Sequence, residues 1–220
     1  MVEDYLSDRE REEALRDWWR ENWRWIIGGA VLGLALLGGW RYWQAHRDQR
    51  ALSASQLYAE FQGALQAHNV DQASRLLTDL QTEHARSAYT QQGRLLLAKA
   101  HVDEGKVDEA MKLLDAVAKS AKDDELAQVA NLRSARLLID QGKYEEALKL
   151  LDPDAAGAFA AKVRELRGDA LAAKGDEEGA RAEYAAALTA NADAQIDRTL
   201  VELKLQEVGG ARSAAAQGQP

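Results

Sequence analysis

The sequence contains no cysteine and very little proline. Its 220 residues include no Cys and only two Pro. A chain without cysteine forms no disulfide, holds no metal through thiolates and has no Cys nucleophile. Two Pro beside 16 Gly also exclude a collagen and a low-complexity polymer. The lack of cysteine does not separate a periplasmic protein from a cytosolic one.

Positive charge is also in short supply. Acidic residues outnumber basic residues by 36 to 28, which gives a net charge of −8 and disfavours nucleic acid as the main partner. The charge is −3 over residues 1–24, +2 over residues 25–50 and −7 over residues 51–220. Hydrophobic residues make up 46% of the chain, which is enough for a packed core and excludes wholesale disorder. The length suits one or two domains.

One long apolar run interrupts the polar N-terminal region. Residues 25–40 carry no charge, and all six Trp of the chain lie within the first 43 residues, on both sides of this run. A helix over residues 25–43 is about 28 Å long, close to the bilayer core of about 30 Å. Aromatic residues at both ends are typical of the two membrane interfaces. The sequence therefore predicts a transmembrane helix over residues 25–43 and a lipid bilayer as a partner.

Two other interpretations of this run remain open. A soluble core helix has a similar apolar length, and a cleavable signal peptide also places an apolar run near the N-terminus. Small residues at Ala51 and Ser53 suit cleavage, but bulky aromatic residues at 40–43 occupy the usual cleavage region. We therefore favour an uncleaved anchor. Five basic residues precede the run and three follow it, which favours a cytoplasmic N-terminus and an exported C-terminal domain.

Two features of the membrane region suggest contacts. Residues 1–24 form a predicted cytoplasmic amphipathic segment, in which Leu15, Trp18, Trp19 and Trp23 recur at helical spacing beside arginines. Within the span, Gly29 and Gly33 lie four residues apart and allow another helix to approach closely. The alternative for these glycines is that Gly is simply common in membrane helices.

The C-terminal region repeats. Gly105, Gly142 and Gly175 stand in turn signals spaced by 37 and 33 residues. Small residues occur seven positions before each Gly and five positions after it: Ala98, Ala135 and Gly168, then Ala110, Ala147 and Ala180. A degenerate earlier copy has His68 in the Gly place and Phe61 in the first small place. Small residues let two helices cross closely, and Gly permits a tight turn.

This pattern predicts an all-α fold of the tetratricopeptide-like type, with helix pairs at a period near 34 residues. A short linker over residues 44–51 leads into an array over residues 52–208. The last helix, over residues 193–208, closes the array with Ile196, Leu200, Leu203 and Leu205 as its apolar positions. Residues 209–220 are small and polar and predict a disordered tail.

No catalytic pattern stands out. The four His are scattered without ligand spacing, and the acidic clusters in turns fit helix capping. There is no phosphate-binding loop and no nucleophile elbow. We therefore expect a binding protein with no cofactor and no metal, not an enzyme.

The first helix of each repeat is expected to line a concave surface. Register places the following candidate protein-binding residues on its exposed side: Leu95, Lys99, Leu132, Arg136, Asp140 and Asp169. The alternative is an ordinary solvated face.

Three segments carry a family resemblance. Residues 39–43 read Gly-Trp-Arg-Tyr-Trp, residues 131–136 read Asn-Leu-Arg-Ser-Ala-Arg, and residues 166–181 include Leu-Arg-Gly-Asp-Ala-Leu followed by Lys-Gly-Asp and Gly-Ala-Arg. With them, the chain resembles the ancillary subunit of the bacterial Sec translocon, a single-span inner-membrane protein with a periplasmic tetratricopeptide-like domain. The residues at 209–220 are not part of that pattern.

The resemblance implies two partners, the Sec translocon and a membrane-anchored periplasmic chaperone of the prolyl-isomerase-like type. It implies a role in passing newly exported proteins to periplasmic chaperones, and an N-terminal segment that restrains a stress-response regulator is also proposed for the family. The alternative function is a tetratricopeptide scaffold or stress-response regulator acting on the cytoplasmic side.

Overall fold

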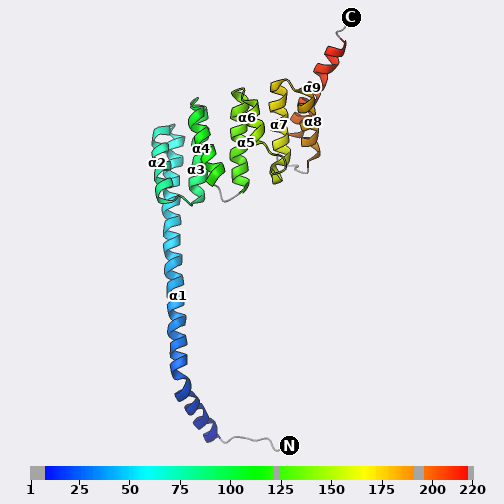
Figure 1. Cartoon of the computed structure of the whole chain (residues 1–220). Helices are drawn as coiled ribbons and strands as arrows, with labels where there is room; N and C mark the ends of the chain where they lie inside the picture. The colour runs from blue at the N-terminus through cyan, green and yellow to red at the C-terminus, as the bar shows by residue number, and fades with distance from the viewer. Residues whose placement is uncertain (1–7, 121–123, 191–195, 218–220) are drawn as a thin grey trace, which may run out of the picture. The chain divides into compact units, whose positions relative to one another are not determined.

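The computed structural model describes residues 8–120, 124–190 and 196–217, and the regular elements in these ranges are all helices. The all-α prediction is confirmed. The chain divides into two compact units, one formed by residues 1–53 and the other by residues 54–220. The two are described separately below, and Figure 1 labels their helices.

The described residues of the first unit lie in α1 (Asp8–Gln66), and the last residues of this helix are part of the second unit. Residues 8–24 of the predicted amphipathic segment, the span and the linker therefore share one helix. The span's large apolar side chains are exposed; Trp25 is 82% exposed and Leu34 is 70% exposed. Exposing so much apolar surface to water is unfavourable, whereas a bilayer core covers it. α1 is long and apolar enough to cross a membrane, as the sequence predicts.

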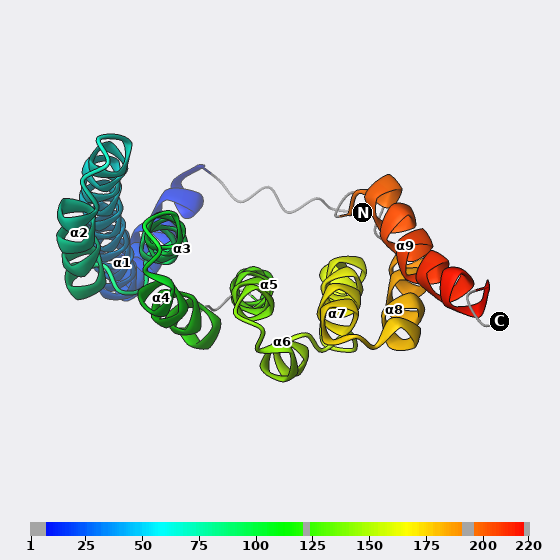
Figure 2. The ribbon, with the colours of Figure 1, turned by 90° about the horizontal axis from the view of Figure 1, so that it is seen from above.

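The second unit is an array of helix pairs. The end of α1 pairs with α2 (Val70–Glu83), and α9 (Arg198–Gln217) comes last. Three pairs lie between them: α3 (Ala88–Asp103) with α4 (Val107–Ser120), α5 (Asp124–Asp140) with α6 (Tyr144–Leu150), and α7 (Ala160–Lys174) with α8 (Glu177–Thr189). A short 3₁₀ turn, η1 (Gly157–Phe159), precedes α7. Seen from above, α3, α5 and α7 form one row while α4 and α6 lie on the other side (Figure 2).

Four turns within the pairs share one backbone geometry. Gly105, Gly142 and Gly175 have φ between 76° and 90°, and His68, which stands in the Gly place of the first pair, has φ 55°. In each turn this residue's N–H donates to the carbonyl three residues earlier, and the next N–H donates to the carbonyl five residues before itself. That is the Schellman ending of a helix, which needs a left-handed residue and explains the recurring glycine.

Small residues lie where the helices cross. Ala98 is 2% exposed, and Ala135, Ala110, Ala147 and Ala180 are fully buried, as predicted from the register. The third repeat has Gly168 at the first position because the ring of Tyr184 from α8 occupies the space that a Cβ would need. The spacing of small residues therefore sets how closely the two helices of each pair approach.

Two of the four apolar positions predicted to close the array, Ile196 and Leu205, pack against it, and the other two do not. Val201 is fully buried and Ile196 is 9% exposed, and both pack among Ala180, Tyr184 and Ala187. Leu200 and Leu203, predicted to face the array, are 45% and 57% exposed, so that part of the prediction is wrong. Leu205 and Val208 are partly buried and pack against the same cluster, because residues 201, 205 and 208 lie on one face of a helix. Of the predicted span of this helix, residues 193–195 lie outside the described residues.

Lys204 completes a cluster of charges between α7 and α9. Its Nζ donates to Glu165 at 3.0 Å and to Asp169 at 2.8 Å, while Lys162 donates to the other oxygen of Glu165. Tyr184 donates its hydroxyl hydrogen to Asp169 at 2.8 Å. Glu165 is only 3% exposed, so its charge depends on these partners.

The cluster shifts the pKa values of Glu165 and Lys204. Burial raises the pKa of Glu165, but hydrogen bonds and attraction from Lys162 and Lys204 outweigh burial and hold that pKa below its ordinary value. Burial lowers the pKa of Lys204, but its bonds to Asp169 and Glu165 outweigh burial and raise it. Both groups are therefore held in their charged forms.

The C-terminal end differs from the sequence prediction. α9 continues to Gln217, whereas a disordered tail is predicted from Gly209. The residues after Gly210 include four Ala together with Arg and Gln, all good helix formers, and the only Pro in this stretch is residue 220. Residues 218–220 lie outside the described residues.

Substitution of Ala135 by Leu tests the helix crossing. Ala135 is fully buried among Ala147, Leu132 and Leu138. Overpacking there is expected to lower the free energy of unfolding by about 1–3 kcal/mol. Urea unfolding of the full chain in detergent micelles, followed by circular dichroism, measures the loss. The matched control is Ala182→Leu, at an exposed site on α8, with an expected change within about 0.5 kcal/mol. Equal stability of the two variants would contradict the crossing.

Substitution of Lys204 by Ala tests the closing cluster. The variant leaves two carboxylates without their shared ammonium, and the same urea experiment at pH 7 is expected to show a loss of about 3 kcal/mol. Lys119→Ala, which removes an exposed ion pair with Asp115, is the control and is expected to cost less than about 1 kcal/mol.

The pH dependence of that difference is a second readout. The lowered pKa of Glu165 means that its contribution to stability is present above its unfolded pKa of about 4.3 and is lost as the pH falls below that value. The difference between the original chain and Lys204→Ala should therefore shrink in acid. If the difference in unfolding free energy between the two proteins were the same at pH 7 and pH 3, the charges of the cluster would not be its cause.

Candidate protein-binding surface

Three of the predicted binding residues line one groove. Lys99 comes from α3, and Arg136 and Asp140 come from α5; all three side chains border a cavity of about 370 Å³. Two apolar side chains, Val102 and Leu137, line it beside them, and the buried Ala98 and Leu114 form its base. We call this cavity the α3–α5 groove. It lies between the first helices of two consecutive pairs, which is the side that the register predicted.

The polar side chains of the groove differ in their bonding. Lys99 forms an exposed ion pair with Asp103 on its own helix, with a distance of 2.7 Å between Nζ and Oδ2. Arg133 donates to the carbonyl of Leu95 at 3.3 Å and so ties α5 to α3. Arg136 is exposed and has no hydrogen-bond or ion-pair partner among the described residues. The groove therefore offers the guanidinium of Arg136, which no described residue engages.

Two predicted surface residues are buried instead. Leu95 is 7% exposed and Leu132 is 8% exposed, so the prediction that they lie on the exposed face is wrong. Each stands three residues before the small residue of its helix, which places it one turn earlier on the face that crosses the partner helix. Leu95 accordingly packs with Ala98 and Leu114, and Leu132 packs with Ala135.

The third repeat is arranged differently. Asp169 has the same register position as Lys99 and Arg136, but its carboxylate bonds to Lys204 and Tyr184 within the chain. Glu165, one turn earlier, is buried in the same cluster. Asp169 is therefore not brought together with the residues of the α3–α5 groove.

A second cavity of about 390 Å³ lies on the other side of Lys99. Leu65, Val70 and Leu96 supply its apolar lining, and Asp103 and Glu104 supply acidic groups. Sequence reasoning did not single out this cavity, nor Arg133, Val102 and Leu137 of the first one. A signal was available on α5, because residues 133, 136, 137 and 140 have the spacing of one helical face.

The predicted packing glycines of the span lie on an open surface. A Cβ added at Gly29 or at Gly33 would meet no atom within 4 Å. Their role in packing against another helix remains a prediction. Within the described residues, no group of three or more His, Asp or Glu is arranged to hold a metal ion.

Comparison with known proteins extends these observations. The family model for the tetratricopeptide repeat-like domain matches residues 16–210, which covers most of α1, the helix pairs and most of α9. A solved structure titled "MamA RS-1 ArsTM double mutant" aligns with a TM-score of 0.49 and 17% identity, over 73% of this chain and 97% of its own.

Two curated relatives carry the same name, ancillary SecYEG translocon subunit. The protein of Escherichia coli is 29% identical over 185 residues, which is 84% of this chain and 89% of that protein. The protein of Haemophilus influenzae is 42% identical over 55 residues, and this matched stretch covers 24% of this chain and only 27% of the relative. The chain therefore belongs to the tetratricopeptide repeat-like domain family and, as its sequence indicates, is a homologue of the ancillary SecYEG translocon subunits.

Proposed function

We propose that this protein is a membrane-tethered, protein-binding adaptor of the Sec translocon, which passes newly exported proteins to periplasmic chaperones. In this proposal the chain crosses the bacterial inner membrane once, with residues 1–24 in the cytoplasm and the array in the periplasm. Its partners are the translocon and a membrane-anchored chaperone of the prolyl-isomerase-like type.

One observation carries the proposal. The similarity to the Escherichia coli ancillary SecYEG translocon subunit extends over 84% of this chain, so it cannot be confined to either the membrane helix or the array. A shared arrangement of anchor and array supports a shared site of action. The name of the relative supports the translocon as partner, and the chaperone is proposed from the family resemblance of the sequence.

The exposed apolar surface of α1 supports the tether. Its large apolar side chains include Ile27 at 48% exposure, Val31 at 61% and Leu36 at 66%, and a bilayer is the environment in which such a surface is stable. The five basic residues before the span against three after it support a cytoplasmic N-terminus.

The short connection limits where the array acts. Ten residues lie between Trp43 and Ala54, the first residue of the second unit. Even a fully extended chain of that length reaches only about 40 Å. The array is therefore kept near the membrane, where a polypeptide that leaves the translocon passes within reach. The exposed residues of the α3–α5 groove supply a surface on which such a chain, or a chaperone, binds.

Substitutions in the span test the association with the translocon. Gly29→Leu together with Gly33→Leu places bulk on one side of the helix while leaving the span apolar. We expect co-purification of the translocon with the full chain in mild detergent to fall severalfold, because close helix approach requires small residues.

A matched control is available in the same helix. Gly28→Leu together with Gly38→Leu adds the same bulk on other sides of α1, given 3.6 residues per turn, and a Cβ at these positions also meets open space. Co-purification should then stay at its original level. If the variant with Leu at positions 29 and 33 still co-purified the translocon at the original level, the predicted packing face would be rejected. If the unsubstituted chain did not co-purify the translocon at all, the adaptor proposal itself would be rejected.

A further inference from the structure

The α3–α5 groove combines an apolar base with polar edges. Val102 and Leu137 line it above the buried Ala98 and Leu114, and its volume of about 370 Å³ lies in the range of ligand-binding pockets. A volume of this size accommodates a few side chains, which suits a short segment of a polypeptide better than a folded surface. Apolar side chains of such a segment would cover Val102 and Leu137.

The charge of the groove is opposite to that of the array around it. Three cations, Lys99, Arg133 and Arg136, border the groove together with one anion, Asp140. Asp103 on α3 is paired with Lys99, and a net positive charge remains after it is included. Residues 51–220 as a whole carry 20 basic and 27 acidic residues. A local excess of positive charge in an acidic domain attracts an acidic ligand and disfavours a basic one.

In the last pair of the array, the charged residue at the register position of Lys99 and Arg136 is neutralised by another residue of the chain. There, Asp169 of α7 faces Lys204 of α9, and the two form an ion pair at 2.8 Å. The ring of Tyr184 from α8 packs against α7, where it occupies the place of a Cβ on Gly168. Its hydroxyl donates to Asp169 of the same helix. Opposite charges on facing helices thus close this part of the array without a ligand.

The α3–α5 groove has the same register, but within the described part of the chain no ion pair joins the lining residues of its two helices. Lys99 pairs instead with Asp103 on its own helix, which leaves Arg136 without a partner among the described residues. Lys99 stands on α3 where Asp169 stands on α7, and the facing helix α5 contributes Arg136. Two cations cannot bond to each other, so an anion between them is the favourable arrangement. Leu114 takes the register position of Tyr184 and is smaller, which leaves the space between the helices open.

We propose that the α3–α5 groove binds an acidic, amphipathic segment of a partner protein, with a carboxylate of that segment between Lys99 and Arg136 and its apolar side chains over Val102 and Leu137. The inference names the chemistry of the segment that the proposed adaptor recognises, and it rests on that function only in requiring a protein ligand. An acidic partner also accounts for the unengaged guanidinium of Arg136.

Peptide binding to the full chain tests this proposal. The chain is placed in nanodiscs of uncharged phosphatidylcholine, without any translocon, so that failure here is distinct from failure of the translocon association. The probe is a short fluorescent peptide of Leu, Ala and Glu, and fluorescence anisotropy measures its affinity. Matched peptides carry Gln or Lys in place of every Glu. We expect the Glu peptide to bind at least about tenfold more tightly than the Gln peptide.

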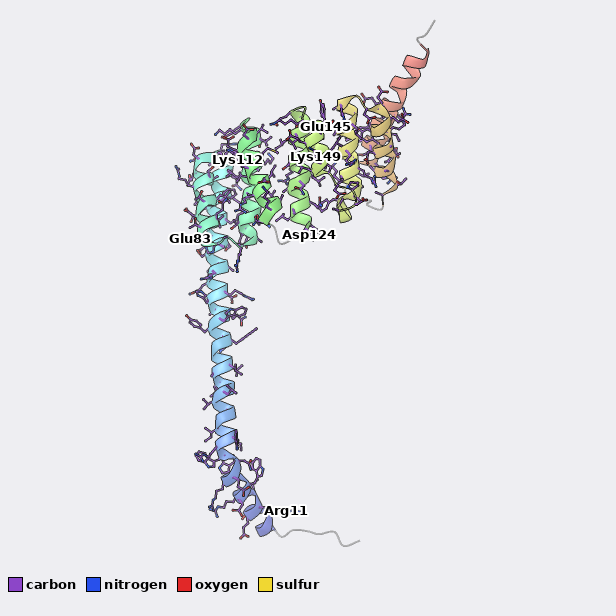
Figure 3. All side chains as sticks on the ribbon, in the orientation of Figure 1. Arg11, Glu83, Lys112, Asp124, Glu145 and Lys149 are labelled. Carbon is purple, nitrogen blue, oxygen red and sulfur yellow. The ribbon has the colours of Figure 1, made fainter. Side chains whose placement is uncertain are left out.

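Charge reversal in the groove supplies the specificity test. The variant Lys99→Glu with Arg136→Glu should lose affinity for the Glu peptide and gain affinity for the Lys peptide. The control variant, Lys112→Glu with Lys149→Glu, makes the same change in net charge at exposed lysines of α4 and α6 (Figure 3). It should keep the original preference for the Glu peptide. Circular dichroism checks that both variants remain helical.

Each outcome decides the proposal. An inverted preference in the groove variant alone supports it. Equal binding of the Glu and Gln peptides, an equal effect of the two variants, or no saturable binding of the Glu peptide would overturn it. Salt provides an independent check, because an interaction of exposed charges weakens as ionic strength rises, and a salt-independent preference would also count against it.

Discussion

Two helices approach closely only where no large side chain separates their backbones, and this constraint organises the array. Ala98 clusters with Ala110, and Ala135 clusters with Ala147. Gly168 and Ala180 are buried at the same positions of the α7–α8 pair. The close crossing buries one face of each first helix and leaves the next face, with Lys99 or Arg136, at the surface. The groove between α3 and α5 is thus a consequence of the way in which the pairs are built. A larger residue at a crossing would change both stability and groove.

A second constraint comes from exposed apolar surface on α1. The array buries its large apolar side chains, for example Phe61 and Leu77, but the span exposes Leu34 and Trp40. The array is therefore stable in water, whereas the apolar surface of the span is stable in lipid. Joining them within one short stretch of chain restricts the array to the neighbourhood of the membrane, which is the physical basis of the proposed adaptor function.

The sequence was most informative where structure is local. The Schellman turns at Gly105, Gly142 and Gly175 depend on single residues, so their spacing predicted the pairs, and even His68 was correctly placed in the degenerate copy. The orientation of whole helices was harder to predict, because it depends on partners far along the chain. Leu95 and Leu132 are buried against second helices. In the closing segment Leu200 is 45% exposed, although Ile196 and Leu205 pack against the array. Of the candidate site, Lys99, Arg136 and Asp140 were found to line one groove, whereas Asp169 bonds within the chain.

The side of the membrane on which the array lies is the most direct test of the account. The absence of native cysteine allows a single reporter, Lys112→Cys, at an exposed site of α4. A membrane-impermeant maleimide is added to cells whose outer membrane has been permeabilised, and labelling is compared with that after lysis of the inner membrane. Full labelling before lysis is the result expected for an array that faces the periplasm, as proposed. Labelling that requires lysis would contradict it and would favour a scaffold or regulator on the cytoplasmic side.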